Sequence, residues 1–489
     1  MSAPSTPVSR PSGFRSPRFL LLAALALVAC LVSAVAIPLA GPLGLLAPRT
    51  YLILAENEDE LRPAGGFITG VAAVTVSRAR VTDFRLADAN SVDDLRQVYP
   101  APPEPLQRYM QSQMWLLRDA NWSPDFPSSA RQAAALYQLG QGVRVDGVVA
   151  FDEAALRAVL AVIGPVRVPG AAQPVTDANF LTLMRAAWSA APGSTDAATW
   201  RTTRKDFMGP LARALLAQLK SIRDPRMAVT LASAIRQSLN QRDILVYLPD
   251  TPLSGMFARA GWDGAVDPGS QDYLRVVDAN VGFNKVNAAI RERLSYSVDL
   301  TDPSEPAASL GVTYTNTVVT AKTCVQFGVA NHSTQYLDYL QDCYWDYWRV
   351  LLPTGSKVWW APANAVPGDE LLSGVAQHDP AQFGPGEGGT TQLAGLFVLP
   401  TGQSHTTQLA YGLPSNVLEA LAAGRAVYRL RVQKQPGTLA LPLDLAITFP
   451  AAWAIQSTTL PASTQAPGQI HFSLSLETDL NFEVVFQHP

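Results

Sequence analysis

The pattern of apolar and polar residues changes twice along the chain and divides it into three parts. Residues 19–40 are almost continuously apolar. Over residues 48–295, short β-branched runs such as YLILAE alternate with longer segments whose apolar positions recur at helical spacing. This alternation predicts an α/β or α+β layered domain. Over residues 296–489, short β runs are separated by Pro-Gly and Thr-Gly turns, which is typical of an all-β sandwich.

Two helical patterns qualify this division. The segment WRTTRKDFMGPLARALLAQLKSI, residues 200–222, predicts one long amphipathic helix in the α/β part. The segment SNVLEALAAG, residues 415–424, predicts an isolated helix inside the β part.

The apolar stretch near the N-terminus predicts a membrane anchor. The run from Phe19 to Ile37 can just span a hydrocarbon core of about 30 Å. The preceding residues 1–18 contain three arginines and no acid, which places this short tail in the cytoplasm. The alternative is a cleaved signal peptide, but the run is longer than a usual signal core. We therefore expect a single-pass protein of the cell membrane whose bulk, from about residue 48, is extracytoplasmic.

The stretch NEDELRPAGGFITG, residues 57–70, follows the first predicted strand and admits two interpretations. Acidic residues lead into a single arginine, Arg62, and then into a glycine pair. In one interpretation Arg62 pairs with Glu60, is buried, and only fixes a turn between two strands. In the other, the glycines let the backbone come close to a ligand. Arg62 then faces a pocket shared with Asp88 and Arg201 and binds a diphosphate.

Composition excludes several kinds of chemistry. The net charge is −3 and the basic residues form no long run, so nothing indicates a nucleic-acid partner. All five histidines and two of the three cysteines lie beyond residue 320, and the third cysteine lies in the apolar stretch. A Ser-His-Asp triad, a Cys-His pair and a His-ligated zinc site are therefore excluded from the α/β part. The sequence contains neither a Walker loop nor a dinucleotide glycine fingerprint.

What remains for the α/β part is carboxylate and arginine chemistry. Its natural ligand is a phosphate or diphosphate, with a hard divalent cation such as Mg2+ held by oxygen ligands. Asp88, at a strand end, is the candidate metal ligand and, with Arg62, the candidate catalytic residue. Three candidate ligand-binding residues share one helix face in WRTTRKDF, for which a solvated face is the alternative. The candidate ligand-binding residues are Arg85, Arg201, Arg204 and Lys205.

Two further stretches combine polar residues with aromatics. They are RDANWSPDFPSSA, residues 118–130, and GWDGAVDPGSQDYLRVVDANVGFNK, residues 261–285. Asx-turns explain much of this polarity without a function, and the wall of a binding site is the other explanation.

Two cysteines, Cys324 and Cys343, fall in the part expected outside the cytoplasm. An oxidising compartment permits a disulfide between them, and two unpaired buried thiols are the alternative. Both lie in strand-like sequence about one hairpin apart, which favours the disulfide.

Several motifs resemble a known family. NEDELRPAGGFITG, RDANWSPDFPSSA, VDGVVAFDEAALRAVLAVIGPVRV and VVDANVGFNK resemble, in this order, the landmarks of the DUF4012 family of bacterial membrane-anchored proteins. YWRVLLPTGS and QKQPG look like its β-rich tail. The resemblance covers most of the chain after the anchor and implies a surface protein without an established activity.

A weaker resemblance is to the LytR-CpsA-Psr family. Its members transfer glycopolymers from a polyprenyl-pyrophosphate carrier to the cell wall, using arginines, aspartates and Mg2+. WRTTRKDF looks like their arginine-rich helix start and matches at Arg201 and Arg204, whereas Lys205 stands where glutamine is usual. NEDELRPAGG stands where that family has an aspartate-threonine pair. Arg62 and Asp88 are therefore assigned to the site by their position in the chain and not by a matching motif.

Two functions follow as hypotheses. The first is a cell-envelope protein that binds a phosphorylated lipid-linked or glycan ligand and possesses, or once possessed, Mg2+-dependent phosphotransferase activity. The second is a non-enzymatic adhesion or scaffold protein with a vestigial pocket, in which the tryptophans of the β part bind the partner. These tryptophans are Trp345, Trp348, Trp359 and Trp360, for which a place in the core is the alternative.

Overall fold

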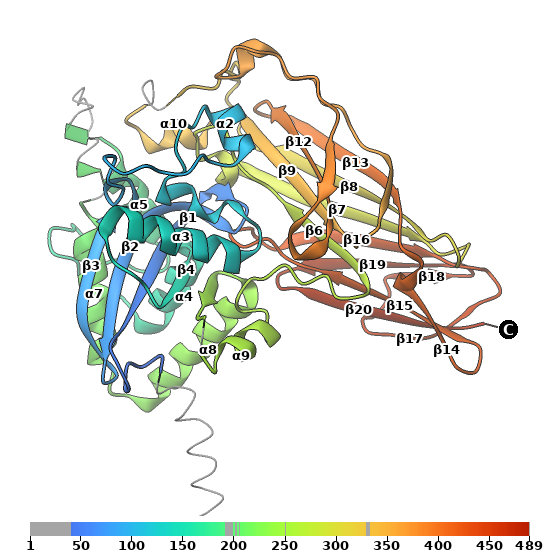
Figure 1. Ribbon diagram of the computed structural model, residues 1–489, viewed down its shortest axis with the longest axis horizontal. Helices are drawn as coiled ribbons and strands as arrows, with labels where there is room; N and C mark the ends of the chain where they lie inside the picture. Colours follow the sequence, from blue (N-terminus) through green and yellow to red (C-terminus); the bar gives the residue numbers. More distant parts are fainter. Residues whose placement is uncertain are drawn as a thin grey trace, which may run out of the picture.

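The chain folds into an α/β domain that lies beside an all-β domain of two facing sheets (Figure 1). The layered α/β part followed by two sandwich-like sheets agrees with the predicted fold class. The computed structural model describes residues 41–190, 199–200, 203–204, 206–249, 251–328 and 333–488.

The predicted tail, residues 1–18, and anchor, residues 19–40, lie outside the described residues. Within the part of the chain that the structure does describe, no helix is both long and apolar enough to cross a bilayer.

The α/β domain is built on a mixed five-stranded sheet in the order β3-β2-β1-β4-β5. The first three strands form an antiparallel meander, and β4 pairs in parallel with β1. The apolar positions of the central strands, such as Leu52, Leu54 and Val148, are buried against α3 (Phe126–Gln141). The strands are β1 (Arg49–Arg62), β2 (Gly65–Ser77), β3 (Arg80–Asp88), β4 (Gly147–Phe151) and β5 (Ile244–Tyr247).

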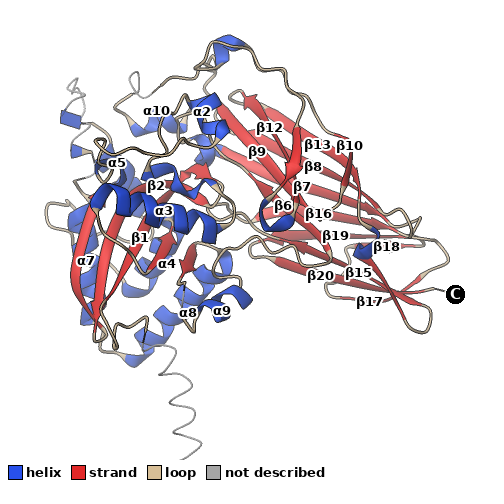
Figure 2. Ribbon diagram, in the orientation of Figure 1, coloured by secondary structure: helices blue, strands red, loops and turns tan. Residues whose placement is uncertain are grey.

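Helices flank this sheet (Figure 2), and aspartates begin three helices of this domain: Asp125, Asp152 and Asp224. Asp125 accepts the amide N–H of Ser128, and Asp152 accepts that of Ala155, which satisfies donors that a helix start leaves free. The sequence predicts one long helix over residues 200–222. In the structure, helix α7 of this region begins at Met208 and ends at Ser221. The helices of this domain are α2 (Glu104–Met110), α3 (Phe126–Gln141), α4 (Glu153–Ile163), α5 (Phe180–Trp188), α7 (Met208–Ser221), α8 (Pro225–Gln241) and α9 (Ser254–Arg259).

The all-β domain consists of two sheets packed over one apolar core. The first sheet has the order β10-β13-β8-β7-β16-β19-β18: β10 (Lys357–Trp360), β13 (Ser404–Gly412), β8 (Ala307–Asn316), β7 (Ile290–Asp299), β16 (Leu441–Thr448), β19 (Gln469–Leu476) and β18 (Thr464–Ala466). The second has the order β11-β12-β9-β6-β15-β20-β17, with β14 paired to β15: β11 (Gln382–Pro385), β12 (Thr391–Leu399), β9 (Tyr344–Leu352), β6 (Asp272–Val277), β15 (Arg425–Val432), β20 (Leu480–Gln487), β17 (Ala454–Thr458) and β14 (Leu418–Leu421).

Two expectations about this domain are corrected. The sandwich begins at β6, residue 272, and not at residue 296, because β6 pairs with β9 and β15. Every residue of β6 and β9 is buried; one face of these strands meets the sandwich core and the other meets the α/β domain, so β6 reads like an α/β strand in sequence. The segment predicted as a helix over 415–424 contains strand β14, because pairing with β15 overrides its helical propensity.

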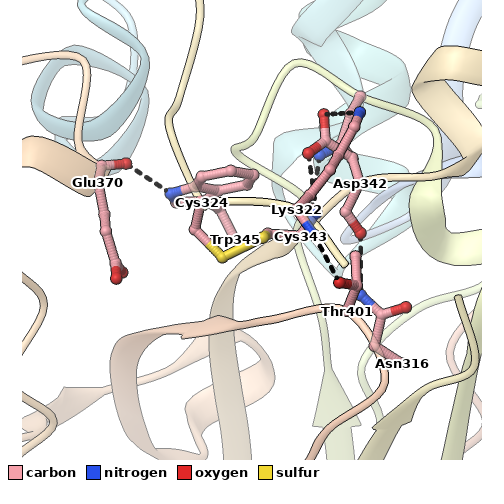
Figure 3. The surroundings of a disulfide bond; sticks show 9 residues. Asn316, Lys322, Cys324, Asp342, Cys343, Trp345, Glu370 and Thr401 are labelled. Carbon is pink, nitrogen blue, oxygen red and sulfur yellow. Dashed lines mark hydrogen bonds and ion pairs between the residues drawn. A yellow bond between two sulfur atoms is a disulfide. The ribbon is translucent and has the colours of Figure 1, made fainter. Parts of the chain in front are cut away.

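A disulfide joins Cys324 to Cys343, the pairing favoured in the sequence. The bridge closes a loop that carries α10 (Tyr336–Leu340) to the seam between the domains. Polar contacts surround the bridge: Asn316 donates to the carbonyl of Asp342 at 2.9 Å, and Trp345 donates to that of Glu370 at 2.9 Å (Figure 3).

A buried carboxyl group in the sandwich core makes stability depend on pH. Asp272 is fully buried and accepts hydrogen bonds from the hydroxyl groups of Tyr296 at 2.8 Å and Tyr428 at 2.5 Å. Burial raises its pKa from 3.8 to about 6, although the tyrosine hydrogen bonds act to lower it. Between these two pKa values the folded state holds a proton that the unfolded state has released.

The contribution of Asp272 to the free energy of unfolding is therefore expected to fall by about 2 to 3 kcal/mol as pH rises from 4 to 6. Above pH 6 this group adds no further change. The measurement is chemical denaturation at several pH values for the wild type and Asp272→Asn. The variant should show a shallower decline over this window, and parallel curves for the two proteins would contradict the assignment.

Candidate functional site

A cavity of about 610 Å³ lies at the seam between the two domains. The α/β domain contributes residues of β1, β2, α2 and the short helix η2 (Leu117–Trp122). The sandwich domain contributes the turn after β6, helix α10 and the loop that contains Leu372. The described residues that line it are of two kinds. The charged ones are Arg62, Arg118, Arg204, Lys285, Glu60 and Asp119, and the apolar or aromatic ones include Phe67, Leu106, Met110, Met114, Leu116, Trp188, Trp200, Phe283 and Leu372.

The stretch NEDELR forms the end of strand β1 and is almost entirely buried. Asn57 pairs with Phe67 and Leu61 pairs with Gly66, so residues 58–60 bulge out of the ladder. In such a bulge, side chains are re-aimed away from the regular alternation.

Each acid of this bulge contacts a different element. Glu58 accepts the amide N–H of Glu153 at the start of α4 at 2.8 Å. Asp59 pairs with Arg185 of α5 at 2.8 Å. Glu60 alone of the three lines the cavity. The bulge therefore ties β1 to the helices and turns around it, which explains why so many acids stand in one short stretch.

The two glycines after Arg62 are required by close packing. Gly65 has φ +139°, and a Cβ atom at this position would lie 1.9 Å from a carboxylate oxygen of Glu56. A Cβ atom on Gly66 would lie 2.3 Å from the backbone of Asn57. The backbone therefore turns sharply and approaches its own strand β1.

Arg62 is fully buried and fully paired. Its Nη2 donates to Glu60 at 3.0 Å, its Nε donates to Asp119 at 3.1 Å, and its Nη1 donates to the carbonyl of Asn280 at 2.8 Å. Burial acts to lower the pKa of this guanidinium, but the charges of Glu60 and Asp119 more than offset it and raise the pKa. Arg62 thus fixes the hairpin, as the first interpretation holds, while it also lines the cavity.

Charges of alternating sign continue from Arg62 along the cavity wall. Lys285 lies 3.4 Å from Glu60 at one end, and Arg118 lies 3.6 Å from Asp119 at the other. Cations thus occupy both ends of this row. The row carries three cations and two carboxylates and leaves positive charge facing the cavity.

Arg204 adds a further cation in an aromatic setting. Its guanidinium lies 4.7 Å from the ring centroid of Trp200 and 5.6 Å from that of Trp188, and the two indoles meet edge to face at 4.8 Å. Such stacking orients a guanidinium, whose N–H groups point outward in the plane of the guanidinium itself. Arg201 and Lys205, predicted to share this site, lie outside the described residues.

A smaller chamber of about 50 Å³ shares Thr69, Trp188, Arg204 and Lys285 with the cavity. Glu153 lies in its wall. Burial, and then the neighbouring charge of Glu58, raise the pKa of Glu153 well above its ordinary value.

Two predicted site residues lie elsewhere. Arg85 is on the exposed strand β3, where it pairs with Asp83 at 2.9 Å. Asp88 accepts the amide N–H of Asn90 at 2.8 Å and thereby starts a short 3-10 helix. Neither is among the described residues that line the cavity, so the structure does not place Asp88 as a catalytic residue there or Arg85 as a ligand-binding one. No group of three or more His, Cys, Asp or Glu among the described residues is arranged to hold a metal.

Sequence reasoning missed most of the aromatic and apolar wall. Arg118, Asp119 and Lys285 belong to the two polar stretches that were interpreted as turns or a site wall, so a signal existed for them. Phe283 lies in the second of these stretches and shares its signal, whereas Trp188 of α5 lies in neither stretch and carried none.

Comparison with known proteins confirms the predicted resemblance to a family over the first three quoted motifs, while VVDANVGFNK and the tail motifs lie outside the matched residues. Residues 47–188 match the family model described as "Protein of unknown function (DUF4012)". No curated protein matches the chain.

Among solved structures, a LytR-Csp2A-Psr enzyme from Actinomyces oris aligns with 15% identity and a TM-score of 0.29, covering 44% of this chain and 75% of that chain. A Listeria innocua protein aligns with 10% identity and a TM-score of 0.25, covering 44% and 78%. A Streptococcus agalactiae protein aligns with 10% identity and a TM-score of 0.28, covering 44% and 74%. Similarity at this level carries no conclusion about activity.

Proposed function

We propose that this chain is a cell-envelope protein that binds a phosphorylated lipid-linked or glycan ligand in the cavity at the domain seam. The observation that carries the proposal is the pairing of cations with an apolar wall in one cavity of about 610 Å³. A cavity of this volume suits a ligand of moderate size.

The charge of the wall favours an anion. Four cations and two carboxylates are among the described residues that line the cavity, and both carboxylates already face arginines. Arginine presents several N–H donors in a plane that matches phosphate oxygens. Met110, Met114 and Leu372 supply apolar surface beside these donors, so a ligand with both a phosphate and a hydrocarbon part would contact both kinds of residue.

Phosphotransfer is the second step of this proposal. The cations would offset the charge of a diphosphate at the reacting group. The carboxylates of the cavity, Glu60 and Asp119, are engaged by Arg62 and do not form a Mg2+ site of their own. The expected Mg2+ would therefore be held mainly by the phosphate oxygens of the ligand.

Binding of farnesyl diphosphate to the full-length chain in nanodiscs tests the proposal. Calorimetry should detect binding that Arg204→Ala weakens about tenfold, which corresponds to about 1.4 kcal/mol. Combining it with Arg201→Ala should weaken binding further. Arg85→Ala removes an exposed arginine outside the cavity and is the matched control, expected to bind like the wild type.

The same titration is repeated with and without Mg2+. Tighter binding with Mg2+ supports the metal-dependent form of the proposal. Absence of binding by a folded wild type under both conditions contradicts the proposal as a whole. Equal losses in Arg204→Ala and Arg85→Ala contradict the location of the site.

An adhesion or scaffold function is the second candidate, and one observation favours it. Trp359 and Trp360 on edge strand β10 are 62% and 51% exposed. Trp345 and Trp348, predicted as further binding residues, are instead buried in β9 and belong to the core. The exposed pair would carry the binding of a partner if the cavity binds no phosphorylated lipid.

A further inference from the structure

The turn between β2 and β3 is bonded to the part of the chain that follows the predicted anchor. Arg78 donates its amide N–H to the carbonyl of Gly44 at 2.9 Å, and Ala79 donates to that of Leu43 at 2.8 Å. Figure 1 shows this turn at the end of the α/β domain where the described chain begins. The position of the turn is therefore set only a few residues beyond residue 40, where the predicted anchor ends.

An anchor over residues 19–40 would hold this turn close to the membrane surface. Between residue 40 and Gly44, an extended chain spans at most about 14 Å. The headgroup layer outside the hydrocarbon core is itself about 5 to 8 Å thick. The backbone of the turn would then lie within about one Debye length of the headgroups at physiological ionic strength. At this range the charges of the turn interact with charged lipids.

The turn carries exposed cations, one of them at a position that its backbone does not favour. Ser77 pairs with Arg80, so Arg78 and Ala79 form a two-residue turn, in which their φ angles are +50° and +58°. Asn-Gly is the usual sequence of such a turn, because other residues rarely adopt positive φ. Arg78 and Arg80 are exposed, and neither forms an ion pair with another described residue. The fold therefore does not by itself account for an arginine at position 78.

Apolar side chains accompany these cations. Leu43, Leu45 and Leu46 precede β1 and are all exposed, Leu46 to 85%. Val81, the residue after Arg80, is exposed as well. Apolar side chains beside basic ones match the boundary between acyl chains and anionic headgroups, where hydrocarbon and negative charge lie close together.

The connection between α7 and α8 adds further positive charge at the same end of the domain (Figure 1). Lys220, Arg223 and Arg226 lie in or beside this connection and are exposed. The single acid between them, Asp224, accepts the amide N–H of Arg226 at 2.9 Å and thereby begins α8. Cations thus outnumber acids on this connection, as they do on the β2–β3 turn.

We propose that residues 43–46, the β2–β3 turn and the α7–α8 connection form a docking surface for a membrane that contains anionic lipids. The leucines enter the headgroup boundary, and the arginines bind the charged headgroups. Docking fixes the orientation of the α/β domain on the bilayer. Since β1 runs from this surface at Arg49 to the cavity at Arg62, docking directs the cavity away from the bilayer, where the glycan part of a ligand would lie. The inference goes beyond the proposed function, because it concerns another surface and requires no ligand in the cavity.

Hydrogen exchange of the full-length chain in nanodiscs tests this inference. One nanodisc contains phosphatidylcholine alone, and the other contains equal parts of phosphatidylcholine and phosphatidylglycerol. Exchange over residues 78–86 should be at least about fivefold slower with the anionic lipid, because each arginine near an anionic surface favours the docked state by about that factor. A high salt concentration should remove the difference, because it screens the charges.

A charge-free turn separates docking from folding. Arg78→Asn with Arg80→Thr removes both cations, and asparagine suits the turn while threonine suits the strand. This double variant should keep or raise the melting temperature and should lose the dependence on anionic lipid. Arg291→Ser with Arg293→Ser removes two exposed arginines at the same spacing on β7 of the sandwich. It is the matched control and should keep the lipid dependence of the wild type.

The outcomes distinguish this inference from the anchor and from the cavity. Equal exchange of an anchored wild type in both nanodiscs overturns the inference and leaves the cavity proposal untouched, as does a turn variant that keeps the lipid dependence. A turn variant that melts at a lower temperature and exchanges faster throughout the α/β domain also overturns it, because the arginines would then be structural residues. If the full-length chain does not remain in the nanodiscs, the predicted anchor fails and the inference fails with it.

Discussion

Replacing Arg62 by alanine is expected to lower the free energy of unfolding by about 3 to 5 kcal/mol. The side chain is fully buried and carries the only guanidinium that joins Glu60 to Asp119 among the described residues. Its removal leaves two buried carboxylates without this partner and takes the guanidinium donor from the carbonyl of Asn280. Buried groups that lose their partners are more costly than the net value of the original bonds. Urea denaturation of the full-length chain in detergent measures the change.

Arg85→Ala is the matched control for Arg62→Ala. Arg85 is an exposed arginine on β3, the edge strand of the same sheet, and forms an exposed ion pair with Asp83, so its loss should change stability by less than about 0.5 kcal/mol. An Arg62→Ala variant that is as stable as the control and has lost only ligand binding would contradict the structural role of Arg62.

Removing the disulfide is expected to destabilise the protein by about 3 kcal/mol. The bridge between Cys324 and Cys343 spans 19 residues, and closing a loop of this length restricts the unfolded chain by about that amount. Both sulfurs are buried, so the double variant Cys324→Ala with Cys343→Ala avoids a buried hydroxyl. Thermal and urea denaturation measure the loss.

A reductant separates the effect of the bridge from that of the substitutions. Dithiothreitol should destabilise the wild type and leave the double alanine variant unchanged. The closed loop carries Tyr336, whose hydroxyl donates to Asp59 at 2.8 Å, so the variant should also bind farnesyl diphosphate more weakly. A wild type equally stable with and without dithiothreitol would contradict this role of the bridge.

Local patterns in the sequence were sufficient for the two-part architecture. Alternation and turn spacing predicted the sandwich, and the glycine pair after Arg62 predicted a sharp approach of the backbone. Pairing of Arg62 with Glu60 was one of two interpretations, and the structure has it. Each of these features depends on residues that are close together in the sequence.

The remainder depended on tertiary contacts that no local pattern carries. Strand β6 is covered on both faces by different domains, so its composition could not say to which it belonged. The propensity of the segment around Leu418 is helical, and only its pairing with β15 makes it a strand. The cavity joins Arg118 to Lys285 and Phe283, which lie more than a hundred residues further along the chain.

The segment QKQPG has a consequence for how this protein is made. Gln435 donates to the carbonyl of Arg62 at 3.1 Å and exchanges hydrogen bonds with the backbone of Asp278, and Gly437 packs against Gly65. The hairpin of β1 and β2 is therefore completed by a residue 373 positions further along the chain. During synthesis, the early strands remain in an unfinished state until the segment QKQPG has emerged. A truncated product would expose the buried charges of the hairpin, which quality-control proteases could recognise.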